Sequence, residues 1–68
     1  MNIDKMIAYE SGELSDADTI TFFAELVKSK MAWSLQGSYG RMASAMIYAG
    51  FISPEGEVTE LAKETFNQ

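Results

Sequence analysis

Apolar residues recur at helical spacing in several separate stretches of the chain. In the first, residues 3–10, the side chains of Ile3, Met6 and Ile7 follow one face of a helix. Gly12 comes just after this stretch, where a left-handed residue commonly ends a helix. The pattern therefore predicts a short N-terminal helix over residues 3–10.

The second stretch, residues 16–29, has the clearest helix signals. Ser15 is a residue type that caps helix N-termini, and Asp16 and Asp18 favour the positive end of a helix dipole. Lys28 and Lys30 follow at the end that favours cations. Between these ends lie the apolar residues Ile20, Phe22, Phe23, Ala24, Leu26 and Val27.

A third helix is predicted from Ser38, acting as its cap, to Ala49, and Gly50 is suited to end it. Its inward face is expected to contain Tyr39, Met42, Ala43, Met46 and Ile47. Gly37 and Gly40 either expose backbone amides to a phosphate or let the second and third helices approach closely, and the second interpretation is favoured.

The C-terminal part combines a turn with a last helix. Residues 53–57 have the composition of a turn, and residues 51–52 and 57–58 are expected to pair around it. Thr59 is expected to cap the last helix, with Leu61, Ala62 and Phe66 facing inward. The whole chain, 1–68, is thus predicted to be a single all-α or nearly all-α domain. We expect a compact bundle of three to four short helices, with a minimal β-hairpin around residues 51–58 as the additional element.

Composition removes several classes of function. The chain has no Cys and no His, which excludes disulfides and leaves structural zinc without its usual ligands. Its carboxylate pairs, Asp16/Asp18 and Glu55/Glu57, lie in charge-dense segments rather than in a cleft that could shift a pKa. We therefore expect no enzyme activity, no cofactor and no metal. Apolar runs fall far short of the roughly 20 residues of a membrane span, so the expected location is cytoplasmic with no membrane partner.

Residues 26–52 contain a distinctive motif, with AWSLQGSYGR at positions 32–41. This stretch resembles the motif GLAWxLQGxYGRxAxxLIxxGxI of small uncharacterised proteins of tailed bacteriophages. It departs from that motif at Lys30-Met31, where Gly-Leu is usual, and at Met42, where Thr is commoner. The resemblance implies a phage accessory protein acting in the host cytoplasm, and it implies no particular chemistry.

The leading functional hypothesis is a protein-binding module that docks on a host protein and modulates it. The chain has more large side chains than a small core is expected to bury, and Trp and Tyr dominate interface hot spots. The candidate contact residues are Trp33, Tyr48, Tyr9 and Phe22. For Trp33, a plug in the core between the second and third helices is an equal alternative. The acidic runs 10–18 and 55–64 would steer the chain toward a basic patch, such as that of a nucleic-acid-binding enzyme.

The alternative is a helix-turn-helix regulator that binds DNA as a dimer. Residues 50–61 have a weaker similarity to the end of winged-helix domains. The third helix would then enter the major groove, with the candidate contacts Gln36, Ser38, Arg41 and Ser44 near the cations Lys28 and Lys30. The net charge of −5 opposes this alternative, because phosphate contacts dominate affinity for DNA. A homodimer is compatible with either function, and it would compensate for a small core.

Overall fold

The structure, a computed structural model, describes residues 3–35 and 37–66 of the chain. It contains the helices α1 (Ile3–Glu10), α2 (Asp16–Lys28), α3 (Gly37–Ala49) and α4 (Glu60–Phe66), with the short 3-10 helix η1 (Met31–Trp33) between α2 and α3. No β-strand forms within these described ranges, so the prediction of a small all-α bundle is confirmed. The expected hairpin is reduced to a single antiparallel bridge between Ile52 and Val58.

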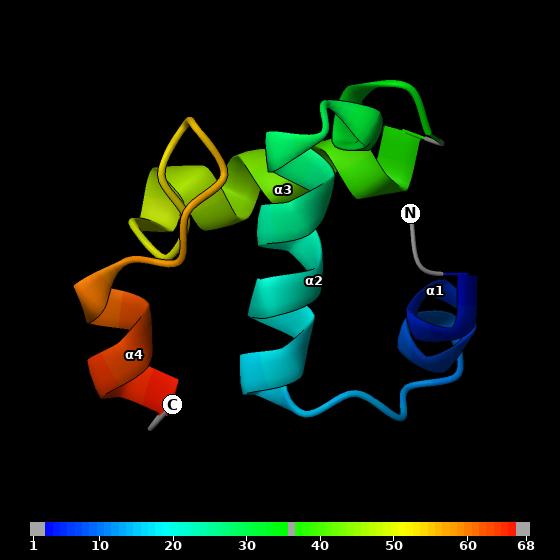
Figure 1. Cartoon of the computed structure of the whole chain (residues 1–68), viewed down its shortest axis with the longest axis horizontal. Helices are drawn as coiled ribbons and strands as arrows, with labels where there is room; N and C mark the ends of the chain where they lie inside the picture. The colour runs from blue at the N-terminus through cyan, green and yellow to red at the C-terminus, as the bar shows by residue number, and fades with distance from the viewer. Residues whose placement is uncertain (1–2, 36, 67–68) are drawn as a thin grey trace.

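Helix α2 is the central element of the bundle. In Figure 1, α3 lies across the C-terminal end of α2, while α1 and α4 lie on opposite sides of it. The molecule measures 27 × 23 × 16 Å along its principal axes. A helix with its side chains is about 10 Å across, so the shortest dimension holds no more than two helix layers. Each outer helix therefore keeps one face open to solvent.

The hydrophobic core is built around α2. That helix supplies six of the buried side chains: Ile20, Phe22, Phe23, Ala24, Leu26 and Val27. The others come one or two at a time from the surrounding elements: Ala32, Tyr39, Ala43, Ile52 and Ala62. Burying a large apolar side chain contributes about 1.5–3 kcal/mol, so most of the hydrophobic stabilisation depends on this one helix.

The prediction that Phe22 forms part of a docking surface is wrong. Its side chain is only 2% exposed, and its ring centroid lies 5.4 Å from that of Phe23 in an edge-on arrangement. Tyr9 is half-buried, with its ring centroid 5.1 Å from Phe23 and 5.7 Å from Tyr39. Both side chains lie in or beside the core because other elements pack against most of the circumference of α2, and not only against one stripe of it.

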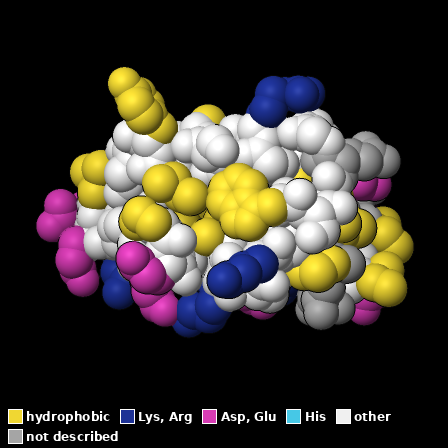
Figure 2. Space-filling view, turned by 90° about the horizontal axis from the view of Figure 1, so that it is seen from above, with side chains coloured by type: hydrophobic (Ala, Val, Ile, Leu, Met, Phe, Trp, Pro, Cys, Tyr) yellow, Lys and Arg dark blue, Asp and Glu magenta, His cyan; other side chains and the backbone are white. Residues whose placement is uncertain are grey.

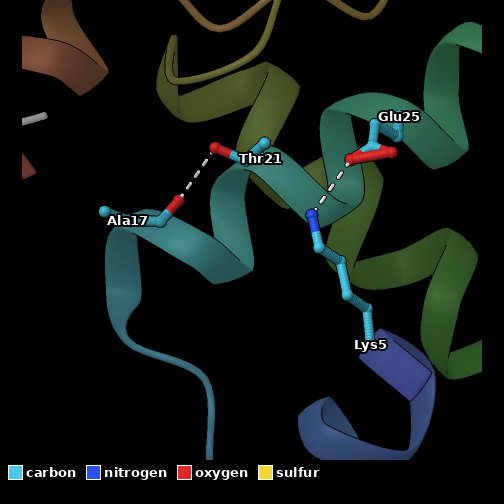
Figure 3. Close-up of polar contacts among 4 residues, drawn as sticks. All are labelled: Lys5, Ala17, Thr21 and Glu25. Atoms are coloured by element: carbon cyan, nitrogen blue, oxygen red, sulfur yellow. Dashed lines mark hydrogen bonds and ion pairs between the residues drawn. The ribbon is translucent and has the colours of Figure 1, made fainter. Parts of the chain in front are cut away.

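Polar contacts fix α2 at its start and connect it to α1. The Ser15 hydroxyl accepts a hydrogen bond from the Asp18 amide at 3.1 Å, which confirms Ser15 as the N-cap. Lys5 Nζ of α1 lies 3.4 Å from Glu25 Oε1 of α2 (Figure 3). Within α2, the Thr21 hydroxyl donates to the Ala17 carbonyl at 3.2 Å, which satisfies this half-buried polar group inside its own helix (Figure 3).

The connection between α2 and α3 departs from expectation in two ways. Helix α3 begins at Gly37, so Ser38 lies inside its first turn and does not cap it. A Cβ atom placed on Gly40 would lie 3.5 Å from the Ala32 carbonyl oxygen and 3.8 Å from Trp33 Cε3. Gly40 therefore faces η1, not α2, and a Cβ atom there would make only ordinary van der Waals contacts. Gly37 lies beside the guanidinium of Arg41 instead of a neighbouring helix.

The segment from Gly50 to α4 forms the expected turn. Gly50 has a φ of +88° and ends α3. The Ser53 amide donates to the Glu57 carbonyl at 2.8 Å, and the Thr59 hydroxyl accepts from the Ala62 amide at 3.2 Å as the predicted cap of α4. Leu61 was expected to face inward but is 47% exposed, because Ala62 occupies the inward position of this short helix.

Candidate functional site

The exposed aromatic residues Trp33 and Tyr48 lie on one side of the molecule. Together with Arg41 and Ser44, they line a single shallow groove. Gly37, Gly40 and Ala45 form the remainder of its lining. The structure therefore brings together two residues from the predicted protein-binding set and two from the predicted nucleic-acid-binding set.

Helix α3 presents two different faces. Tyr39 and Ala43 are buried against the core, while Arg41, Met42, Ser44, Ala45, Tyr48 and Ala49 are exposed. We refer to Trp33 and these six exposed residues as the η1–α3 surface. Figure 2 looks onto the molecule from the side of α3 and shows hydrophobic side chains spread across this face, with acidic side chains toward its edges. The exposed side of α3 is thus unusually apolar for a solvent-facing helix.

Trp33 is neither fully exposed nor a plug of the core. Its side chain is 51% exposed, and its indole ring packs over the backbone of Gly40. Tyr48, on helix α3, is 96% exposed. The two aromatic residues therefore differ in role, because Trp33 is held in place on one side while Tyr48 projects freely.

The charge of this surface is opposite in sign to that of the whole chain. No Asp or Glu occurs between residues 26 and 54, and all ten acidic residues lie outside that segment. Three of the five cations, Lys28, Lys30 and Arg41, lie inside it. The η1–α3 surface is consequently cationic in a chain whose net charge is −5. The sequence already contained this signal, although the net charge conceals it.

The predicted nucleic-acid-binding residues are dispersed. Lys28 forms an ion pair with Glu57 at 2.6 Å and lines a different groove, beside Gly56. Ser38 and Lys30 are exposed, and Gln36 lies outside the described residues. Only Arg41 and Ser44 of this set share the groove of Trp33.

The connection between α2 and α3 also differs from that of a helix-turn-helix motif. That motif joins its two helices by a turn of about 3–4 residues. Here α2 ends at Lys28 and α3 begins at Gly37, and the intervening residues 29–36 include η1. The expected likeness to a helix-turn-helix domain is therefore not supported by the way α2 and α3 are connected.

The exposed face of α3 also borders an apolar cavity of about 400 Å³, on the flank of the helix that lies away from Trp33. Met42, Ala45, Met46 and Ala49 form its wall on α3, and Ile20, Phe51, Phe66, Thr19 and Asp16 complete it. Phe51 and Phe66 meet edge-on there, with ring centroids 5.1 Å apart. Exposed apolar surface thus continues across α3 from the groove of Trp33 to this cavity.

Tyr39 is a titratable residue whose pKa is shifted by its surroundings. Burial and a hydrogen bond to Glu10 raise the pKa of Tyr39 to about 12, which keeps this hydroxyl protonated. Among the residues that the structure describes, no three or more acidic side chains gather as a group that could hold a metal ion. In the same part of the chain, no helix is long and apolar enough to cross a membrane.

Comparison with known proteins places the chain in a family without a known role. A family model described as "Domain of unknown function (DUF7417)" matches residues 1–68. No curated protein and no solved structure matches the chain. The match covers the whole sequence, and the chain therefore belongs to the DUF7417 family.

Proposed function

We propose that this chain is a protein-binding module that docks on a host protein through the η1–α3 surface and modulates that protein. The observation that carries the proposal is the position of Trp33 and Tyr48, 51% and 96% exposed, on the same groove. Trp, Tyr and Arg are the residue types that dominate interface hot spots. The resemblance to small proteins of tailed bacteriophages supports a bacterial host and its cytoplasm as the site of action.

The charge of the surface indicates the chemistry of the partner. Because the η1–α3 surface carries Arg41 and no acid, a matching patch would be apolar at its centre with carboxylates at its edge. The acidic residues lie elsewhere on the chain and would stay outside such a contact. A basic patch of a nucleic-acid-binding enzyme fits those acidic segments, but it does not fit this surface.

Capture from nuclease-treated bacterial lysate tests the proposal. The tagged wild-type chain should retain one host protein in stoichiometric amount, and Trp33→Ala and Arg41→Glu should each lower that retention at least about tenfold. Ile3→Ser is the matched control, since Ile3 is an exposed apolar residue on α1. Circular dichroism melting of each variant separates loss of binding from loss of fold.

Three outcomes would contradict the proposal. The first is a host protein retained equally by wild type and by the folded Trp33 variant. The second is that the tagged wild type retains no host protein in stoichiometric amount. The third is recovery of nucleic acid alone, lost on nuclease treatment or at raised salt, which would favour the DNA-binding alternative instead.

A further inference from the structure

We propose that the exposed face of α3 also binds a second copy of this chain, with the two α3 helices antiparallel and crossing at Ala45. This inference rests on the proposed function and divides its surface, because the second copy covers Arg41 and Tyr48 while Trp33 stays open to the host protein. The exposed residues Arg41, Met42, Ala45, Tyr48 and Ala49 form its basis. The other four lie three or four residues from Ala45, which places the five residues on one stripe of the helix.

The stripe is symmetric about its middle residue. Ala45 lies at the centre, with Arg41 and Met42 before it and Tyr48 and Ala49 after it. At about 100° per residue, Arg41 and Tyr48 lie on one flank of Ala45, while Met42 and Ala49 lie on the other. A two-fold axis through Ala45 keeps each flank facing its own counterpart, as in an isologous dimer.

The antiparallel arrangement pairs complementary side chains. Arg41 of one copy lies beside Tyr48 of the second copy, where the guanidinium can stack on the phenol ring. On the other flank, Met42 of one copy packs over the small Ala49 of the second. Each pairing occurs twice, once on either side of the axis. The arrangement therefore covers both Tyr48 rings, which are 96% exposed in the single chain.

Charge favours antiparallel over parallel packing. Helix α3 contains no acidic residue, and Arg41 is its single cation. In an antiparallel pair the two Arg41 positions lie roughly 12 Å apart along the helices, whereas in a parallel pair they lie at the same level. Each Arg41 also lies near the C-terminal end of the opposite α3, which favours a cation. That end carries no basic residue of its own in its last turn.

Side-chain size at the crossing permits close approach. Ala45 and Ala49 are the smallest side chains on the stripe, and short side chains reduce the distance between packed helices. Trp33 contacts Gly40 on the Arg41 flank, so both Trp33 side chains fall on the same side of the pair. The dimer would then present two copies of Trp33 to a host protein at once.

The absence of cysteine from the chain makes the contact directly testable. Ala45→Cys introduces a single thiol at the crossing, and Glu64→Cys introduces one on an exposed position of α4 as the control. Under mild oxidation, Ala45→Cys should form a covalent dimer on the order of 10–100-fold faster than Glu64→Cys, because the contact raises the effective concentration of the thiols. Equal rates would overturn the proposal.

The direction of the helices is tested with two different single-cysteine chains, one of them carrying a mass tag. When Arg41→Cys is mixed with Tyr48→Cys, the antiparallel pair predicts that the mixed dimer forms faster than either self dimer. Faster formation of the self dimers would indicate parallel helices and overturn the arrangement proposed here.

Light scattering of the protein without cysteine completes the test. The wild type should approach twice the monomer mass as concentration rises, while Ala45→Glu and Tyr48→Ser should remain monomeric and Ile3→Ser should behave as wild type. A wild type that stays monomeric overturns this proposal alone if Trp33-dependent capture of a host protein persists. A dimer that captures no host protein overturns only the proposed function.

Discussion

The hydroxyl of Tyr39 donates a 2.6 Å hydrogen bond to Glu10 Oε2 and thereby connects the start of α3 to the end of α1. The phenol ring is 5% exposed and packs beside Phe23. Helix α1 has no fully buried residue of its own, so this bond and the ring of Tyr9 are important for holding it against the bundle.

We predict that Tyr39→Phe lowers the free energy of unfolding by about 1 kcal/mol at neutral pH, the usual net contribution of one hydrogen bond. Glu10 is exposed and can be rehydrated, so the loss should not greatly exceed that value. Denaturant titration measures the change. A variant as stable as wild type would show that the bond contributes nothing to holding α1.

The same residue predicts a pH dependence. Burial, followed by the hydrogen bond to Glu10, raises the pKa of Tyr39 from 10.0 to about 12. Folding therefore favours the protonated phenol, and this contribution is fully present below pH 10 and is lost as the pH rises through 12. Stability measured against pH should fall more steeply over that window for the wild type than for Tyr39→Phe. Parallel curves would contradict the prediction.

Gly56 and Gly12 form a matched pair for testing backbone packing. Both have positive φ, +95° and +74°, but a Cβ atom on Gly56 would lie 2.5 Å from the Lys28 amide nitrogen, whereas one on Gly12 would meet nothing within 4 Å. Gly12→Ala should therefore cost about 1–2 kcal/mol from the left-handed conformation alone. Gly56→Ala should cost clearly more, because the turn must also move away from the end of α2. Equal losses in thermal melting would show that this packing is unimportant.

Local signals explain why much of the fold could be predicted from the sequence. Ser15 caps α2 through a bond three residues away, and Gly12 and Gly50 adopt the positive φ that their positions after a helix suggest. Such features depend on neighbours in the chain, so the ends of α1 and α2 were close to expectation. The burial of Phe22 depends instead on how many helices surround α2, and a hydrophobic stripe does not show this.

The candidate surface was predicted only in part, for a similar reason. Trp33 and Tyr48 were selected by residue type. Their position on one groove depends on the short helix η1, which the sequence around Gly37 and Gly40 did not predict. The acid-free segment 26–54 could have been found by following charge along the chain. A net charge summed over the whole chain hides it, because the surrounding segments are strongly acidic.

Lys30 has a φ of +67°, the left-handed conformation that side chains other than glycine adopt at a cost. It stands where the resembling phage motif has glycine. Lys30→Gly should therefore raise the free energy of unfolding by about 0.5–1 kcal/mol, after allowing for the greater freedom of glycine in the unfolded chain. Lys30→Ala is the control, since it removes the charge but keeps the Cβ atom. If both variants raise the free energy of unfolding equally, the cause is the loss of charge rather than the backbone conformation.

Arg41 distinguishes a protein-binding surface from a DNA-binding one. Its side chain is exposed on α3, so Arg41→Glu should leave the melting temperature within about 2–4 °C of wild type, as expected for a surface substitution. If the chain bound DNA through α3, the wild type would shift a duplex at low salt, and the variant would lose that shift because a phosphate contact becomes a repulsion. With the −5 net charge and Lys28 already paired with Glu57, we expect no duplex shift from either protein. An electrophoretic mobility assay at low salt decides the matter, and a clear shift by the wild type that Arg41→Glu abolishes would assign α3 to nucleic acid rather than to a protein partner.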